Sequence, residues 1–138
     1  MIKGISHLTF IVHDLEKATL FFEKIFSAKV VYDSGVQSFS VSKERYFQIG
    51  ELWIAAMEGK VPLEKTYNHT AFHIDDKDYE EYEKRIIDIG LALKKPRSRV
   101  EGEGRSLYFY DYDNHLFELH TGTLSERLTA YASFITAK

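Results

Sequence analysis

Residues 102–122, with the sequence GEGRSLYFYDYDNHLFELHTG, decide the fold because they predict a β-hairpin. Residues 106–111 alternate between aromatic and smaller side chains, and residues 115–120 alternate again. Alternation with a period of two is typical of paired strands. Between the two segments, Asp113 and Asn114 are residue types that favour a tight turn. We therefore expect two adjacent strands joined by this turn.

Glu118 is the unusual residue on the second strand of the hairpin. The strand period places it on one face with Leu116 and His120, while Phe117 and Leu119 flank it in a segment suited to burial. A buried carboxylate requires a compensating partner. We therefore expect Glu118 to pair with a cation or with backbone donors, or else to bind a metal ion.

The composition limits the fold and the chemistry. A chain of 138 residues with 44% hydrophobic side chains can bury a real core, either as one domain or as two small halves. The chain contains no cysteine. This excludes a disulfide framework, thiolate metal ligands and a cysteine nucleophile.

Charge and hydropathy exclude two classes of partner. The net charge of -3, with mixed signs along the chain, predicts no broad basic surface, so we expect no nucleic-acid partner. No apolar run approaches the length that spans a bilayer, so we expect no membrane partner. The amino-terminal segment MIKGISHLTFIVHDL lacks a small-residue cleavage site and predicts a strand, which favours a cytoplasmic protein.

The chain contains an internal repeat. The segment HLTFIVHD, which begins at His7, aligns with HTAFHIDD, which begins at His69, at an offset of 62 residues (69 − 7). Each half predicts a strand, a helix and three more strands, so we expect two βαβββ modules that build a shared sheet. The expected organisation is a single domain over residues 1–138, with modules at residues 4–58 and 66–122 and a closing helix at residues 123–138.

Hydrophobic periodicity and capping residues predict the elements of each module. In the first module, Asp14 caps a helix over residues 15–26, and strands are expected at residues 5–12, 29–32, 38–41, 45–49 and 51–57. In the second module, Asp75 and Asp76 cap a helix that ends before Gly90, and strands at residues 67–74 and 91–93 accompany the hairpin. Thr123 caps the closing helix over residues 124–135.

The repeat supplies two candidate companions for Glu118. His7 and His69 occupy matching positions on the first strand of each module, and Glu118 lies on the last strand of the second module. Two imidazoles and one carboxylate form a facial ligand set with open positions, which suits Mn(II), Fe(II) or Zn(II). The repeat offset matches Glu118 to Ala56, beside Ala55, so no fourth protein ligand is expected. Taken singly, each histidine also fits a hydrogen-bonded core residue.

The metal-ligand set and two longer motifs resemble a known family. The motifs are TYNHTAFHI (residues 66–74) and EGEGRSLYFYDYDNHLFELHTGTLSERL (residues 101–128). Together with His7, His69 and Glu118, they resemble the vicinal oxygen chelate superfamily, and within it the fosfomycin resistance proteins. The similarity is greatest to the FosX type, the Mn(II)-dependent hydrolases, and it extends over residues 2–128.

The resemblance implies a fold, a reaction and an assembly. The fold is the α+β vicinal oxygen chelate (glyoxalase/bleomycin resistance/dioxygenase) fold, in which two βαβββ modules form a cupped mixed sheet. The reaction is hydrolysis of the epoxide of fosfomycin, a small phosphonate, to a vicinal diol phosphonate, with Mn(2+) or another divalent metal as cofactor. Two chains are expected to pair as a homodimer with shared active sites.

The resemblance also implies that Glu44, in the segment VSKERYF, is the general base. Opening an epoxide with water requires a Lewis acid on the ring oxygen and a base that takes a proton from the water. The carboxylate of Glu44 can be that base. Without the resemblance, the charged segment SKER predicts a solvated surface residue instead.

A phosphonate dianion requires cationic and hydroxyl partners. Ser106 and Tyr108 share a strand face, and Arg127 lies on the closing helix. All three match positions that contact the phosphonate in the resembled family. A second guanidinium is expected from Arg99 or Arg97, where the thiol-transferring relatives have a lysine.

Three further residues share the predicted pocket face, although ordinary core packing also explains their pattern. By strand phase these are Thr9, Trp53 and Tyr67. The other histidines are expected to be structural or exposed, and among them only His120 is placed to approach the metal. These histidines are His13, His73, His115 and His120.

Two other functions use the same fold. A thiol transferase that adds glutathione, cysteine or bacillithiol to fosfomycin would use the same metal and anion site, with room for the thiol. A drug-binding protein without catalysis would need neither a metal nor a base. The resemblance favours the hydrolase because Glu44 matches the general base of the FosX type.

Overall fold

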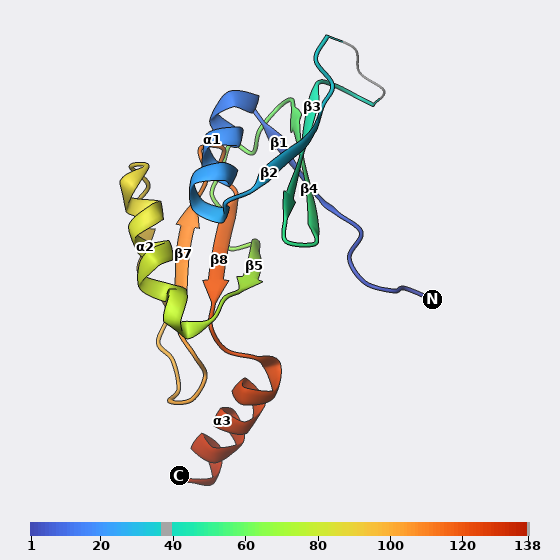
Figure 1. Cartoon of the computed structure of the whole chain (residues 1–138). Helices are drawn as coiled ribbons and strands as arrows, with labels where there is room; N and C mark the ends of the chain where they lie inside the picture. The colour runs from blue at the N-terminus through green and yellow to red at the C-terminus, as the bar shows by residue number, and fades with distance from the viewer. Residues whose placement is uncertain (37–39, 138) are drawn as a thin grey trace. The chain divides into compact units, whose positions relative to one another are not determined.

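The computed structural model describes residues 1–36 and 40–137, and these form two compact units. Unit 1 contains residues 1–66 with 111–115, and unit 2 contains residues 67–110 with the chain from residue 116 onward. Figure 1 follows the order of the elements along the chain. None of the helices in the described residues combines the length and the hydropathy that a membrane crossing requires.

Unit 1 is a four-stranded mixed sheet with one helix. Its strands follow the order β1-β4-β3-β2, and only the β1 and β4 pair is parallel. The elements are β1 (Leu8–Val12), α1 (Leu15–Phe26), β2 (Lys29–Asp33), β3 (Glu44–Ile49) and β4 (Leu52–Glu58). The first strand is shorter than the expected strand at residues 5–12: it begins at Leu8, so His7 lies just before it.

Helix α1 forms where the capping signal and the hydrophobic stripe predicted it. The Asp14 carboxylate accepts a hydrogen bond from the backbone N–H of Glu16 at 2.8 Å, which satisfies a helix-terminal donor. The buried stripe includes Phe22, whose ring lies 5.0 Å from that of Phe47 on β3. Burying such a side chain contributes about 1.5–3 kcal/mol. Helix α1 thus covers one face of the unit 1 sheet.

The opposite face of the unit 1 sheet carries the residues of functional interest. Strand register places Ala55 on β4 between Thr9 on β1 and Tyr46 on β3. The next row along places Met57 beside Glu44. Because side chains alternate along a strand, these residues point away from α1.

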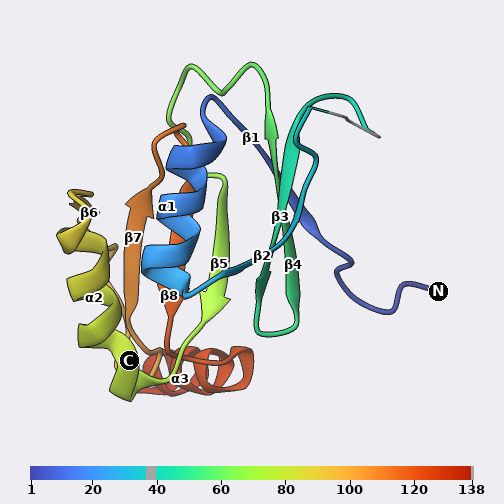
Figure 2. The ribbon, with the colours of Figure 1, turned by 45° about the horizontal axis from the view of Figure 1, so that its top comes forward.

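Unit 2 repeats the pattern of a four-stranded mixed sheet with a covering helix. Its strands follow the order β5-β8-β7-β6, and only β5 and β8 run parallel. The elements are β5 (His69–His73), a 3-10 turn η1 (Asp76–Asp78), α2 (Tyr79–Asp88), β6 (Leu93–Lys94), β7 (Ser106–Tyr110), β8 (Leu116–His120) and α3 (Leu124–Thr136). Figure 2 shows α2 lying along β7, and α3 beyond the end of β8.

The predicted hairpin is confirmed as β7 and β8, which pair with Tyr108 opposite Glu118. Its turn is held by Asp111, whose carboxylate accepts hydrogen bonds from the backbone N–H groups of Asp113 and His115 at 2.8 and 2.9 Å. Asn114 adopts a left-handed conformation with φ of 66°. Asparagine tolerates that region better than most residues, which explains its place in the turn.

Four further expectations differ from the structure. Strand pairing forms one four-stranded sheet in each unit and no shared sheet among the described residues. Asp75 and Asp76 do not cap α2 through their side chains; the helix begins with η1, and Asp76 pairs with Arg105 at 2.8 Å. The strand expected at residues 91–93 is shifted to Leu93–Lys94. The strand expected at residues 38–41 lies partly outside the described residues, and Ser40 and Val41 form no strand.

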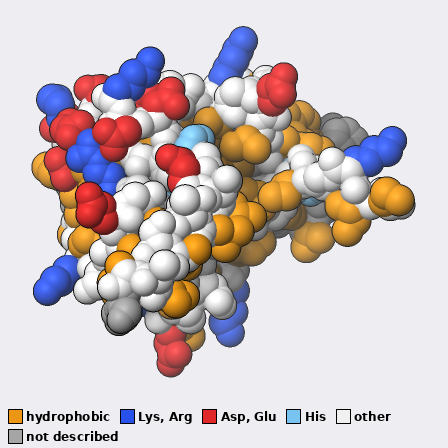
Figure 3. All heavy atoms as spheres, turned by 90° about the horizontal axis from the view of Figure 1, so that it is seen from below, with side chains coloured by type: hydrophobic (Ala, Val, Ile, Leu, Met, Phe, Trp, Pro, Cys, Tyr) orange, Lys and Arg blue, Asp and Glu red, His pale blue; other side chains and the backbone are white. Residues whose placement is uncertain are grey.

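The surface mixes charge types, as the composition predicted. On the face seen in Figure 3, exposed hydrophobic side chains lie among scattered lysine, arginine, aspartate and glutamate side chains. Helix α3 contributes Leu124, Leu128 and Ile135 to the exposed hydrophobic residues of the chain.

Helix α3 begins with a complete capping box. The Thr123 hydroxyl accepts a hydrogen bond from the backbone N–H of Glu126 at 3.2 Å, and the Glu126 carboxylate accepts one from the Thr123 N–H at 3.0 Å. Each bond satisfies a backbone donor that the helix itself leaves unpaired. The helix that this cap begins carries Arg127 and Tyr131.

We expect Thr123→Ala to lower the free energy of unfolding by about 1 kcal/mol, because it removes the side-chain acceptor of the capping box. Urea denaturation followed by far-ultraviolet circular dichroism measures the change. The matched control is Thr129→Ala, at an exposed position in the same helix, which should stay within about 0.5 kcal/mol of the wild type. Equal losses in the two variants would contradict a specific capping role.

Candidate active site

Strands β5 and β8 bring His69 and Glu118 together in unit 2. The register sets His69 opposite Leu116 and Ala71 opposite Glu118, so His69 and Glu118 lie one row apart on the same face. The His69 Nε2 atom lies 3.0 Å from Glu118 Oε1, and Glu118 is only 4% exposed. The pairing predicted from the repeat therefore exists for these two residues.

The tautomer of His69 follows from its other nitrogen. The Nδ1 atom lies 2.7 Å from the backbone carbonyl oxygen of Tyr67, which can only accept a hydrogen bond, so Nδ1 carries a proton. In the neutral ring, the Nε2 lone pair then faces a carboxylate oxygen of Glu118. Two electron-rich atoms at this distance require a cation between them, either a proton on Nε2 or a metal ion. A ligand histidine anchored through a carbonyl is also the usual arrangement in metal sites.

Glu118 is held in its ionised form. Burial acts to raise its pKa, but hydrogen bonds from Ser106 and Tyr108 and the nearby imidazoles outweigh burial and keep the pKa below its usual range. The Ser106 hydroxyl donates to Oε2 at 2.5 Å. One carboxylate oxygen is thus engaged by the protein, while Oε1 faces His69. The donor set of His69 and Glu118 fits a divalent cation.

Unit 2 supplies only part of the expected ligand set. Within the described ranges, no three histidine, aspartate or glutamate side chains converge on one point. The third expected ligand, His7, belongs to unit 1, where it is exposed. Its Nδ1 lies 3.0 Å from the Ser6 hydroxyl, and its ring stacks on Trp53 with the centroids 4.1 Å apart.

The position in unit 1 that matches Glu118 is Ala55. Glu118 pairs with Ala71 on β5, and Thr9, the repeat partner of Ala71, pairs with Ala55 on β4. The sequence offset alone had selected Ala56, which differs by one residue because the segment between strands is longer in unit 2. Alanine has no ligand atom, so the register moves the matching position from Ala56 to Ala55 without adding a ligand there.

Arg99 brings a guanidinium to the face of Glu118. Its Nη2 atom donates to the Ser106 hydroxyl at 2.8 Å and to the Tyr108 hydroxyl at 3.0 Å, and lies 3.4 Å from Glu118 Oε2. The sequence left Arg97 as the alternative. Arg97 pairs instead with the buried Glu103. Arg99 is therefore the arginine that joins Glu118, Ser106 and Tyr108 in one polar cluster.

Tyr108 and Tyr67 form the hydroxyl side of the cluster. Their hydroxyl oxygens lie 3.5 Å apart, and the Tyr67 ring packs against His69 at a centroid distance of 4.9 Å. Burial, followed by the hydrogen bond with Tyr67, raises the pKa of Tyr108 to about 12. Tyr108 therefore stays protonated near neutral pH and can donate a hydrogen bond to an anion.

Arg127 reaches the cluster through His120. The Arg127 Nη2 atom lies 3.3 Å from His120 Nε2, and because arginine only donates, this nitrogen accepts. The proton of His120 is then on Nδ1, 2.7 Å from the Ser106 hydroxyl. Burial lowers the pKa of His120, which favours this neutral form. His120 thus connects Arg127 to Ser106 in a chain of hydrogen bonds that ends at Glu118.

Glu44 is buried, which contradicts the interpretation of the segment SKER as solvated surface. The residue is 4% exposed at the start of β3. Its backbone is clamped by Ser34, whose hydroxyl accepts from the Glu44 N–H at 3.0 Å and whose N–H donates to the Glu44 carbonyl at 3.0 Å. The Tyr46 hydroxyl donates to the carboxylate at 3.0 Å, and this bond, followed by burial, raises the pKa of Tyr46.

Trp53 and Thr9 share the face of the unit 1 sheet that carries Glu44. Trp53 is 39% exposed, with its ring against His7 and an edge-on contact to Tyr46 at 5.2 Å. Thr9 is exposed as well. Neither residue is buried in the core of unit 1, so core packing does not explain their placement.

The sequence analysis missed Glu103, a carboxylate with 0% exposure in unit 2. It accepts hydrogen bonds from Arg97, from the Tyr131 hydroxyl at 2.9 Å and from the Val100 N–H at 3.0 Å, and Arg99 Nη1 lies 3.2 Å away. The signal in the sequence was the pattern EGEGR. The flanking glycines at positions 102 and 104 adopt φ of 87° and 90°, which other residues rarely adopt.

Comparison with known proteins places the chain in a family. The model of the glyoxalase/bleomycin resistance protein/dioxygenase superfamily matches residues 4–119. Over 137 residues the chain is 54% identical to the fosfomycin resistance protein FosX of Mesorhizobium japonicum, and the match covers 99% of each chain. The chain belongs to the FosX family.

A solved FosX structure agrees with this assignment. The FosX variant of Listeria monocytogenes in complex with Mn(II) and 1S,2S-dihydroxypropylphosphonic acid has a TM-score of 0.87 and 53% identity. The similarity covers 95% of this chain and 99% of that one. The metallothiol transferase FosB of Bacillus licheniformis is more distant from this FosX-family chain, at 39% identity over 94% of this chain and 82% of the relative.

We expect the stability of this FosX-family chain to depend on Glu103 in acid. Burial raises its pKa, but the hydrogen bonds from Arg97, Val100 and Tyr131 outweigh burial and lower the pKa from 4.5 to about 2. A depressed pKa contributes stability above pH 4.5 that is lost as the pH falls toward 2. In urea denaturation, the free energy of unfolding should therefore fall more steeply over this range for the wild type than for Glu103→Gln.

The matched control for this acid dependence is Glu101→Gln. Glu101 is an exposed carboxylate two residues earlier in the same loop, and the substitution changes the net charge equally. Its pH profile should follow that of the wild type. Parallel profiles for the wild type and Glu103→Gln would show that Glu103 has no special role in acid stability.

Proposed function

We propose that this chain is a fosfomycin resistance enzyme that hydrolyses the epoxide ring of fosfomycin to a vicinal diol phosphonate. The observation that carries the proposal is the pairing of the ionised Glu118 with His69, beside the donors of Arg99, Ser106 and Tyr108. A cation site next to clustered anion donors suits a small substrate that has both a phosphonate and a reactive oxygen.

The metal site is proposed to consist of His7, His69 and Glu118, with Mn(2+) as the cofactor. The FosX structures of Listeria monocytogenes hold Mn(II), which supports this choice of metal. When bound, the metal acts as a Lewis acid that polarises the epoxide oxygen. The Ser106 hydroxyl and Arg99 hold the second oxygen of Glu118, so the first remains oriented toward His69.

The phosphonate is proposed to bind to the donors that surround Glu118. Arg99 provides a guanidinium, Ser106 and Tyr108 provide hydroxyl groups, and Arg127 approaches through His120. Charge-assisted hydrogen bonds of this kind are about twice as strong as neutral ones. The remaining surface of the substrate, which is apolar, is proposed to contact Thr9, Trp53 and Tyr67.

Glu44 is proposed to be the general base. Its carboxylate takes a proton from water as the water oxygen attacks an epoxide carbon. The bond between that carbon and the ring oxygen breaks, the ring oxygen takes a proton from solvent, and Glu44 returns its proton to solvent, so the sum of the reaction is addition of one water. Tyr46 donates to one oxygen of Glu44 and Ser34 clamps its backbone, so the base is held in one orientation.

The chemistry of a bound ligand supports hydrolysis over thiol transfer. The Listeria monocytogenes FosX variant holds 1S,2S-dihydroxypropylphosphonic acid, which is the type of diol that water addition to an epoxypropylphosphonate yields. Thiol transfer remains the second candidate because FosB proteins are also relatives. Phosphorus NMR of fosfomycin with Mn(II) and protein separates the two, since a hydrolase forms the diol without glutathione, cysteine or bacillithiol. Conversion only in the presence of a thiol would favour the transferase.

We also propose a homodimer with two shared sites, each with His7 from one chain and His69 with Glu118 from its partner. Two observations support this. His7 lies in unit 1 and the other two ligands lie in unit 2, and the described residues hold no three-ligand cluster. An isologous dimer would complete both sites at once.

The general-base role of Glu44 is tested by Glu44→Gln. The amide oxygen can still accept the hydrogen bond from Tyr46, so the side chain should keep its place while it loses the ability to take a proton. We expect kcat to fall by about 10²- to 10⁴-fold, the usual share of general base catalysis. Mn(II) content and fosfomycin binding should stay unchanged, as measured by elemental analysis and calorimetry.

The control for this substitution is Glu51→Gln, which removes an exposed carboxylate from the turn between β3 and β4. It should hydrolyse fosfomycin at the wild-type rate. If Glu44→Gln also retains the wild-type rate, Glu44 is not the base and the proposed mechanism fails.

Shared sites predict complementation between inactive variants. Mixed and refolded in equal amounts, His7→Ala and Glu118→Ala chains should form heterodimers with one intact site each, which restores about a quarter of the sites. The control mixture, His69→Ala with Glu118→Ala, has both defects in unit 2 and should stay inactive. Heterodimers of the first pair that show no activity would exclude shared sites.

A further inference from the structure

We propose that Glu103 is the positioning residue of the anion site, because it holds the guanidinium of Arg99 in the orientation that presents it to the substrate. This inference rests on the proposed function only in identifying the bound anion as a phosphonate. The Glu103 carboxylate contacts Arg99, Arg97, Tyr131 and the Val100 N–H, and as an anion it would repel a bound anion instead of binding it. It therefore acts through Arg99 and not on the substrate.

Arg99 bridges two buried carboxylates. Its Nη1 atom lies 3.2 Å from Glu103 Oε1, and its Nη2 atom contacts Ser106, Tyr108 and Glu118. The Nε atom is buried and has no hydrogen-bond partner within the described part of the chain. Because a guanidinium is planar and rigid, the contact of Nη1 with Glu103 helps to set the direction of Nη2.

Glu103 also connects Arg99 to helix α3 through hydrogen bonds and ion pairs. The Tyr131 hydroxyl donates to Oε1 at 2.9 Å, and Arg127 Nε lies 3.5 Å from the same oxygen. Arg97 pairs with it from the loop. Three arginines thus converge on one carboxylate, and two of them, Arg99 and Arg127, belong to the proposed phosphonate site.

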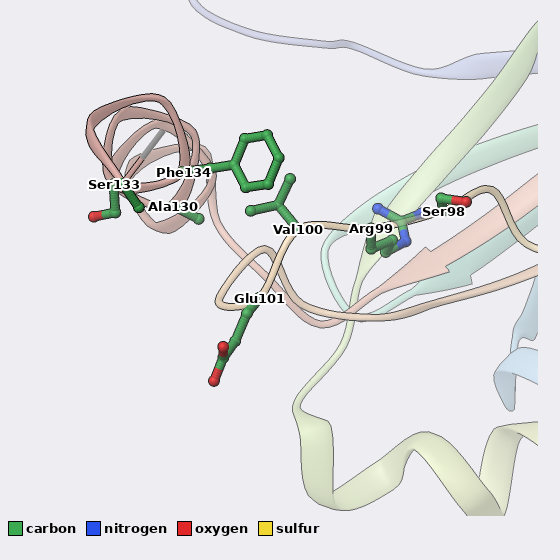
Figure 4. A pocket seen from close by; sticks show the side chains of 8 residues that line it. Ser98, Arg99, Val100, Glu101, Ala130, Ser133 and Phe134 are labelled. Carbon is green, nitrogen blue, oxygen red and sulfur yellow. The ribbon is translucent and has the colours of Figure 1, made fainter.

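The loop itself is shaped to keep Glu103 in this place. Its second oxygen accepts from the Val100 N–H at 3.0 Å, which closes the loop on itself. At Gly104 a Cβ atom would lie 2.7 Å from the backbone nitrogen of Gly122, so only glycine fits there. In Figure 4, Arg99 lies beside the strands, Val100 and Phe134 point toward one another, and Glu101 points away from both.

Positioning and charge neutralisation make opposite predictions for this residue. If Glu103 only neutralised the arginines, its conversion to a neutral residue would leave them more positive and strengthen anion binding. If Glu103 positions Arg99, the same change weakens anion binding, because the single acceptor oxygen of a glutamine amide cannot serve both the Val100 N–H and the arginines. The sign of the change in anion affinity therefore distinguishes the two roles.

The experiment measures sulfate binding to the full chain by calorimetry, with and without Mn(II), for wild type and Glu103→Gln. Sulfate is a suitable probe because it accompanies Mn(II) in a FosX structure of Listeria monocytogenes. We expect about a 10-fold or larger loss of affinity, the usual effect of losing a charge-assisted hydrogen bond. The KM for fosfomycin should rise by a similar factor, with kcat and Mn(II) content nearly unchanged.

Two further variants distinguish an effect of side-chain geometry on sulfate binding from an effect of charge, and they remain usable if Glu103→Gln misfolds. Glu103→Asp keeps the charge but shortens the side chain by one methylene, so positioning predicts weakened binding and charge neutralisation predicts wild-type binding. Tyr131→Phe removes one donor to Glu103 from α3 without changing charge, and it should weaken binding by a smaller factor, about 2- to 5-fold. Glu101→Gln, with the same charge change at an exposed site, should bind like the wild type.

Stronger or unchanged sulfate binding by Glu103→Gln would overturn the inference. If Glu103→Gln does not fold, as judged by circular dichroism, Glu103→Asp and Tyr131→Phe test the inference instead. Wild-type affinity for sulfate in both of these variants would overturn it. Because the sulfate measurement requires no turnover, it is independent of the proposed hydrolysis. A wild type that binds sulfate but leaves fosfomycin intact would refute the proposed function alone.

Discussion

The organisation of unit 2 depends on the contact between His69 and Glu118. Burial of the Glu118 carboxylate is unfavourable unless cations and donors surround it. The strands supply those groups, because the register of β7 and β8 sets Tyr108 opposite Glu118 and Ser106 opposite His120. The Nε2 atom of His69 then lies 3.0 Å from Glu118 Oε1, a contact that either a proton on Nε2 or a divalent cation can bridge. The same residues that make burial tolerable thus define the site.

A second buried carboxylate, Glu103, extends this arrangement away from the sheet. Arg99 lies between Glu103 and Glu118, so the two carboxylates are connected through one guanidinium. Replacing buried ion pairs with apolar residues is often neutral or stabilising. The cluster is therefore better explained by the site that it shapes than by its contribution to stability. Helix α3 joins the cluster through Tyr131 and Arg127, which contact the same oxygen of Glu103.

The two modules of the repeat have diverged in complementary ways. Where unit 2 carries the carboxylate of Glu118, unit 1 carries Ala55, which has no ligand atom at the matching position. Unit 1 instead contributes His7 and the buried Glu44, with Trp53 and Tyr46 packed beside them. Each unit therefore holds part of the expected chemistry, which is consistent with assembly of the complete site from two chains.

The sequence by itself determined the repeat, the hairpin, the caps at Asp14 and Thr123 and the pairing of His69 with Glu118. The hairpin and the caps depend on periodicity and on neighbours within a few residues, which a sequence displays directly. The pairing of His69 with Glu118 followed from the internal repeat, because the repeat predicts that their strands lie in the same module. Tertiary structure alone decided that Arg99 and not Arg97 joins the cluster, that Glu44 is buried, and that Glu103 links the loop to α3. Those outcomes depend on which way a side chain turns and on contacts up to 28 residues apart, as between Glu103 and Tyr131. No local pattern encodes such contacts, because they exist only once the strands and helices have packed.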